Sequence, residues 1–279
     1  MSLPGHLRPR RRVGAPAWRA ALALVAAALL AATAQAAPVS ITPTTIVITP
    51  QRTTELLSLA NDSDEPLRFE LSVFAWTQSP AGETVLSPTQ DIIFFPPLLA
   101  VAPGRIAKVR VGTATPFAGG EKSYRVIIQQ LPNEANPANA GQIQILTKFS
   151  LPLFLEPAGA HPAAVIDSAA FAAGMLDFAV RDAGTAHFVL QRVHAVGSDA
   201  SGATTFETSA DGWYVLAQGR RDYRLAIAES ACRRTSRVRI EAITDRGSTQ
   251  EAVPLAPGGC DSRVRTTAFV AASAPARTP

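Results

Sequence analysis

Short apolar runs, not long amphipathic stretches, organise this chain. Beyond the first 36 residues, no long segment repeats apolar residues at helical spacing. Runs rich in Val, Ile, Leu, Phe and Thr, separated by Gly, Pro, Asn and Asp, are typical of strands and turns. In the first half they occupy residues 40–50, 53–61, 67–78, 106–112, 123–132 and 142–155. Strands at this spacing predict an antiparallel sandwich of immunoglobulin-like size.

The second half repeats this pattern after a break rich in Pro, Gly and Ala at residues 155–164. Further short runs occupy residues 164–174, 175–184, 186–197, 204–209, 213–229, 236–247 and 250–255. The sequence therefore predicts an all-β chain of two immunoglobulin-like β-sandwich domains, at residues 37–157 and 158–270. Residues 271–279 are small and polar, and we expect a disordered tail.

The first 36 residues have the three parts of a secretory signal peptide. A basic start precedes an apolar run at residues 20–34, and Ala34 and Ala36 stand at the small-residue positions of a cleavage site. The run is too short for a typical membrane span, which needs about 20 apolar residues. An uncleaved anchor is the alternative. Cleavage after Ala36 predicts an exported protein with no stable membrane insertion.

Removal of this leader changes the charge balance. The leader holds five arginines and no acidic residue, so cleavage takes the formal net charge from +4 to −1 and leaves 243 residues. The basic character of the full chain therefore does not indicate a nucleic-acid partner.

The chain has two cysteines, Cys232 and Cys260. Because exported cysteine pairs usually oxidise, we expect a disulfide between them in the second domain. Two buried free thiols are the alternative.

Catalytic and metal-binding patterns are missing from the mature sequence. His161, His187 and His194 do not stand at metal-ligand spacing, and no common nucleotide-binding or hydrolase motif is present. We therefore expect a binding protein rather than an enzyme, with no metal and no cofactor. The histidines are expected to be structural or solvent-facing. Trp76, Trp213 and Tyr214 are expected to pack in cores or between domains.

Residues 141–157, "GQIQILTKFSLPLFLEP", form an unusual strand. Ile143 and Ile145 share one face, Gln142 and Gln144 share the other, and Lys148 interrupts the apolar part. The isoleucines could point into the home domain, as in an ordinary sheet. Alternatively, the strand could lend them to another polypeptide that adds beside it.

Several segments, taken in order, resemble periplasmic pilus-assembly chaperones of the chaperone–usher pathway. They are residues 44–61, 67–78, 94–111, 121–132 and 142–157. Residues 182–202 and 213–227 resemble the archaic branch, whose subunits are of the spore-coat-protein-U type. The resemblance implies two immunoglobulin-like domains set at an angle, with a subunit-binding cleft between them.

The resemblance also implies which residues bind the subunit. The strand at residues 142–154 would complete the sheet of an incomplete pilin, with Ile143, Ile145 and Thr147 as donors and Leu131 lining the edge nearby. A pilin that lacks a strand exposes its core, and an uncovered groove drives aggregation.

The family anchors the subunit's C-terminal carboxylate on two cations, and this sequence departs from that pattern. The usual arginine and lysine positions are Thr45 and Pro152. Arg125 and Lys148 are the substitute candidates, because a cation in an apolar strand needs an anion. The alternative is that both point to solvent.

The sequence therefore predicts a periplasmic chaperone that captures fimbrial subunits by strand donation and passes them to an outer-membrane usher. A structural or adhesive protein of a surface fibre, and a carbohydrate-binding module, are the alternatives.

Overall fold

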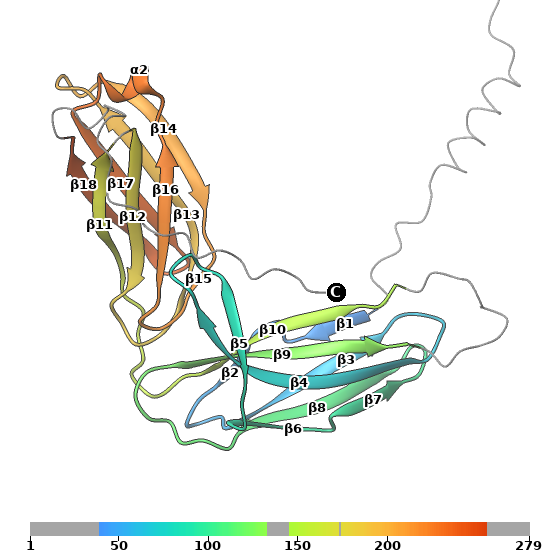
Figure 1. The fold of residues 1–279 in the computed structure, drawn as a ribbon. Helices are drawn as coiled ribbons and strands as arrows, with labels where there is room; N and C mark the ends of the chain where they lie inside the picture. The colour runs from blue at the N-terminus through green and yellow to red at the C-terminus, as the bar shows by residue number, and fades with distance from the viewer. Residues whose placement is uncertain (1–38, 133–144, 173, 256–279) are drawn as a thin grey trace, which may run out of the picture. The chain divides into compact units, whose positions relative to one another are not determined.

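A computed structural model describes residues 39–132, 145–172 and 174–255 of the chain, which fold almost entirely as strands (Figure 1). The described residues belong to one compact unit that begins at Val39. The expected leader, the tail, Ile143 and Cys260 lie outside them. Among the described residues, no helix is long and apolar enough to cross a membrane.

Two packed sheets form the first sandwich. One sheet has the order β1-β3-β8-β6, and the other has the order β2-β10-β9-β4-β5, with β7 also paired to β4. The strands are β1 (Val39–Thr42), β2 (Ile46–Ile48), β3 (Thr54–Asn61), β4 (Leu67–Gln78), β5 (Thr84–Pro88), β6 (Ile92–Phe95), β7 (Leu98–Val101), β8 (Ile106–Thr113), β9 (Lys122–Leu131) and β10 (Lys148–Leu155).

The first expected strand divides between the two sheets. β1 pairs with β3 in one sheet, and β2 pairs in parallel with β10 in the other. Pro43 lies between them, and a proline has no N–H with which to continue a ladder. The split places β2 against the end of β10, which matters for the binding edge described below.

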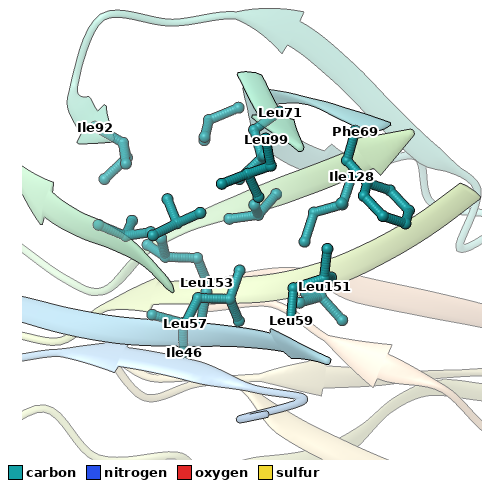
Figure 2. Close-up of a cluster of buried hydrophobic side chains, with 14 of the residues drawn as sticks. Ile46, Leu57, Leu59, Phe69, Leu71, Ile92, Leu99, Ile128, Leu151 and Leu153 are labelled. Carbon is teal, nitrogen blue, oxygen red and sulfur yellow. The ribbon is translucent and has the colours of Figure 1, made fainter. Parts of the chain in front are cut away.

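Alternate residues of the facing strands fill the core of the first sandwich (Figure 2). Leu57 and Leu59 of β3 meet Leu151 and Leu153 of β10, and all four are buried. The period-two spacing of these leucines turns them all to the inner face. Figure 2 also labels Ile46, Phe69, Leu71, Ile92, Leu99 and Ile128.

The core position of Leu153 gives a stability prediction. Its side chain is 0% exposed between β2 and β9, so Leu153→Ala should lower the free energy of unfolding by about 2–5 kcal/mol. Leu98→Ala is the control, because Leu98 is 60% exposed, and we expect a change within about 0.5 kcal/mol. Urea unfolding followed by circular dichroism measures both. Equal losses would contradict the packing at Leu153.

The second sandwich has the sheets β11-β12-β16 and β14-β13-β17-β18, with β15 paired to β13. Its core includes Leu176, Phe178, Phe188, Val193 and Ile240. The elements are β11 (Ala164–Ala172), β12 (Met175–Asp182), β13 (Phe188–Ser198), β14 (Thr204–Asp211), β15 (Tyr214–Val215), β16 (Arg220–Ala226), α2 (Glu229–Cys232), β17 (Arg237–Thr244) and β18 (Gly247–Pro254).

The all-β prediction of two sandwiches is confirmed, with local corrections. Three strands, β5, β6 and β7, lie between residues 84 and 101, outside the runs that were predicted as strands. Residues 213–229 were expected to form one strand, whereas they contain β15, β16 and the start of α2. The domain boundary after residue 157 stays a prediction, as does the disulfide. Cys232 is fully buried, but its expected partner lies outside the described residues.

Candidate functional site

One edge of β10 is open over most of its length. β9 pairs with β10 from Lys148 to Leu155, but β2 reaches only Leu153–Leu155. Within the described part of the chain, Lys148–Pro152 therefore have no strand on their second side. Unpaired backbone groups on such an edge are a template on which another strand can add.

The expected donor residues precede this edge. Ile145 is 86% exposed and does not pack into the home core. Thr147 is half-buried. Its C=O accepts the backbone N–H of Gln130 at 2.9 Å, and its N–H donates to the side-chain Oε1 of Gln130 at 3.2 Å. Ile143 lies outside the described residues, and the strand itself begins at Lys148 rather than at Gln142. The donor roles stay predictions.

Arg125 of β9 is a buried cation. Its residue is 7% exposed, and its guanidinium carbon lies 3.7 Å from the ring centroid of Trp76 and 5.6 Å from that of Tyr214. Its Nη1 donates a weak hydrogen bond to the carbonyl of Ser150 at 3.4 Å. Burial lowers the pKa of the Arg125 guanidinium, and the charge interaction with Tyr214 opposes this shift. Among the described residues, no carboxylate forms an ion pair with it.

The sheet register places Arg125 beside Pro152, the position that the sequence resemblance assigns to the family's lysine. Arg125 and Pro152 are direct cross-strand partners on β9 and β10. Opposite residues of an antiparallel pair share a face and lie about 5 Å apart. Thr45, which the sequence resemblance assigns to the family's arginine, is exposed just before β2. Pro152 carries no charge, and Arg125 places a cation directly beside it.

Lys148 differs from Arg125 in its surroundings. It lies opposite Gln129 at the start of β10, on the same face as Pro152, and it is exposed. A solvated ammonium has no need of a protein anion. Of the two candidate cations, Arg125 is the one whose burial calls for a partner.

Aromatic residues from both sandwiches surround Arg125. Trp76 is 2% exposed and contacts Phe154 and Tyr214 at centroid distances of 6.1 and 5.3 Å. Its Nε1, the buried donor beneath the cation, has no hydrogen-bond partner in the described part of the chain. The side-chain amide of Gln78 donates to the Tyr214 carbonyl at 2.9 Å and accepts the Leu216 N–H at 3.1 Å. These bonds fix Tyr214 against the first sandwich.

A cavity of about 380 Å³ adjoins this cluster, and it is lined by residues of both sandwiches, including Trp76, Gln78 and Leu216. Tyr124 also lines it and donates to Asp91 at 2.7 Å. Several polar side chains that line the cavity, among them Gln78, Tyr124 and Glu121, have hydrogen-bond partners. The described residues contain no set of three metal-ligating side chains.

Sequence reasoning missed Glu121 and His187. The Nδ1 of His187 lies 2.8 Å from each carboxylate oxygen of Glu121, and the imidazole stacks on Phe154 at 3.5 Å. His187 was expected to be structural or solvent-facing, and its contacts place it beside the candidate anchor. Trp76 and Trp213 were both expected to pack in a core or between domains. Trp76 is buried, whereas Trp213 is 49% exposed.

Comparisons with known proteins agree on the fold. Residues 38–161 match the family model described as pili and flagellar-assembly chaperone, PapD N-terminal domain. No curated protein sequence matched the chain.

Solved structures of pilus chaperones resemble the chain at low sequence identity. One is the CsuC–CsuE chaperone–tip subunit pre-assembly complex from archaic chaperone–usher Csu pili of Acinetobacter baumannii, with TM-score 0.55, 18% identity and coverage of 78% of this chain and 98% of that one. Another is the class 5 fimbriae chaperone CfaA, with TM-score 0.54 and 12% identity; the match covers 78% of this chain and 100% of CfaA. The E. coli chaperone DraB has TM-score 0.50 and 17% identity; the match covers 78% of this chain and 98% of DraB.

Residues 38–161 therefore match the pilus-chaperone family model, and the two sandwiches have the fold of the solved chaperone–usher pilus chaperones.

Proposed function

We propose that the mature chain is a periplasmic chaperone that binds pilin subunits through β10 and delivers them to an outer-membrane usher. The segment from Ile143 to Thr147, continuing into β10, completes the subunit's unfinished sheet. We assign the chain to the archaic branch because residues 182–202 and 213–227 resemble that branch.

The open edge of β10 carries this proposal. Residues Lys148–Pro152 lack a second strand neighbour in the described chain, and the exposed Ile145 precedes them. A subunit strand that adds here gains main-chain hydrogen bonds, while the isoleucines enter its apolar groove. Each isoleucine that becomes fully buried contributes about 1.5–3 kcal/mol.

Arg125 is the anchor that we propose for the subunit's C-terminal carboxylate. A buried guanidinium without an ionic partner has lost hydration that a carboxylate can replace. The planar fork of arginine also suits a two-oxygen acceptor better than an ammonium does. Lys148, which is exposed, can add a longer-range attraction as the subunit approaches.

Release needs no nucleotide in this scheme. The donor segment is replaced by the extension of another subunit, so the groove stays filled while the chaperone leaves. The usher is where this exchange takes place.

Purification of the tagged full-length protein from periplasm, with the secreted proteins encoded beside it, tests the function. We expect a stable complex with one small pilin-like subunit, which an excess of the subunit's own N-terminal extension displaces. Self-assembly into fibres without another subunit would instead indicate a structural fibre protein. Retention on immobilised glycans, without subunit recovery, would indicate a carbohydrate-binding module.

A further inference from the structure

A buried acid–base pair lies next to the proposed anchor. Glu121 precedes β9, His187 precedes β13, and the side chain of Glu121 is 0% exposed. Besides the two contacts of Nδ1 at 2.8 Å, the backbone N–H of His187 donates to Oε1 at 3.3 Å. A buried carboxylate is costly without such donors, so these contacts offset the cost of burying Glu121.

The contact with Glu121 assigns different roles to the two imidazole nitrogens. An ionised carboxylate only accepts hydrogen bonds, and Nδ1 is the donor to Glu121 in that state. Nε2 of His187 has no hydrogen-bond partner in the described part of the chain, and this side chain is 13% exposed. Proton binding at Nε2 therefore changes the charge of the pair from −1 to zero and leaves the bond to Glu121 in place.

Three rings connect this pair to Arg125. His187 stacks on Phe154 of β10 at 3.5 Å and 11°, Phe154 contacts Trp76 at 6.1 Å, and Arg125 lies over Trp76. Phe154 is two residues from Pro152, the cross-strand partner of Arg125. Packed rings therefore form a contiguous path from the imidazole to β10 and to the cation at the anchor.

The titratable groups that face His187 are few. Glu121 approaches it from the first sandwich, and Tyr214 of β15 lies 5.8 Å from it between ring centroids. β10 contributes only the uncharged Phe154. A second histidine, His161, accepts the N–H of Ala186 at its backbone carbonyl, and its ring Nδ1 lies 3.3 Å from the carbonyl oxygen of Gly159.

We propose that His187 is a positioning residue for the Arg125 anchor and that protonation of its Nε2 strengthens capture of the carboxylate. The inference rests on the proposed function. With a neutral imidazole, the pair keeps the negative charge of Glu121, which repels an incoming carboxylate. With an imidazolium, that charge is cancelled, so the site attracts the ligand more strongly. Histidine is the side chain that makes this change between about pH 5 and 8.

The test measures the affinity of the full mature protein for acetate. Acetate binding is followed by NMR as the shift of the guanidinium Nε–H signal of Arg125. Acetate is ionised at both pH 6 and pH 8, so its own titration does not contribute. We expect about fivefold tighter binding at pH 6, the lower end of typical coupling between sites. His187→Asn keeps an N–H near the Nδ1 position and cannot be charged, so we expect this pH dependence to vanish.

Two histidine variants are matched controls. His194 also lies 2.8 Å from a glutamate, Glu207, but through Nε2 and on an exposed side of β13, so His194→Gln keeps its donor. His161→Asn removes the other nearby imidazole. Both should retain the fivefold difference. If His187→Asn is unstable, the wild type gives a second measurement, because the midpoint of the affinity change must coincide with the titration of the His187 imidazole signals.

The outcomes separate this inference from the proposed function. Acetate binding at Arg125 with no pH dependence, or with the same dependence in His187→Asn, overturns the role of His187 and leaves the anchor intact. Failure of acetate to perturb Arg125 at either pH overturns both the anchor and the inference that rests on it.

Discussion

Replacing Ile143 and Ile145 together by asparagine should abolish subunit capture while the chaperone itself stays folded. Each substitution removes an apolar side chain from the subunit's groove and buries an amide there without partners. The amide alone costs about 1–3 kcal/mol, so the double variant should bind at least about 100-fold more weakly. The home fold should be unaffected, because Ile145 is 86% exposed and contributes little to its own core.

Affinity of the purified subunit, measured by calorimetry or by competition, tests this expectation, and the unfolding midpoint reports the fold. Ile106→Asn is the matched control, since Ile106 is 63% exposed at the start of β8, in the other sheet. It should leave affinity and stability unchanged. Undiminished capture by the double variant would exclude strand donation through this segment.

Alternation in the sequence was sufficient to predict the sandwiches. Leu57 and Leu59, or Leu151 and Leu153, turn to one face because side chains in a strand alternate, and that face is the core. β5 shows where this reasoning fails. All five of its residues are exposed, so no buried face imposes a period-two pattern on residues 84–88. β7 is only four residues long and directly follows Pro96 and Pro97, so no alternating run long enough to predict a strand is present there.

The sequence also identified Arg125 and Lys148 as candidate anchors and favoured Arg125 only slightly. Both are cations on adjacent strands; spacing places Lys148 on the face of Pro152, whereas the sheet register places Arg125 there. The difference arises from Trp76 and Tyr214, which cover Arg125 and belong to distant parts of the chain. Burial of this kind depends on tertiary packing, which no local pattern encodes.

The Glu121–His187 pair has even less local signal. The two residues come from different sandwiches, and each stands in a short connection just before a strand. A single acid after two glycines and a single histidine before a phenylalanine are common in exposed turns. Only the fold brings them within 2.8 Å and removes the carboxylate from water.

Arg125→Ala should weaken subunit binding by about 10- to 100-fold, because a charge-assisted hydrogen bond contributes about 1.5–3 kcal/mol. Lys108→Ala is the control: Lys108 is an exposed cation on β8, outside the sheet that contains β10, and its loss should change affinity little. Arg125→Lys should recover only part of the loss, since an ammonium lacks the two-pronged geometry. Equal effects of Arg125→Ala and Lys108→Ala would remove Arg125 as the anchor.

A double-mutant cycle isolates the carboxylate from other effects of the substitution. The second partner is the same subunit with an amidated C-terminus, which removes the negative charge and keeps the donated-strand contacts. If Arg125 binds that carboxylate, amidation should weaken binding to the wild type but add little to the loss in Arg125→Ala. Additive losses would instead mean that Arg125 acts through the packing of Trp76 and Tyr214, and that the carboxylate binds elsewhere. Because Arg125 stacks on these rings, only the coupling between the two changes separates its charge from its packing.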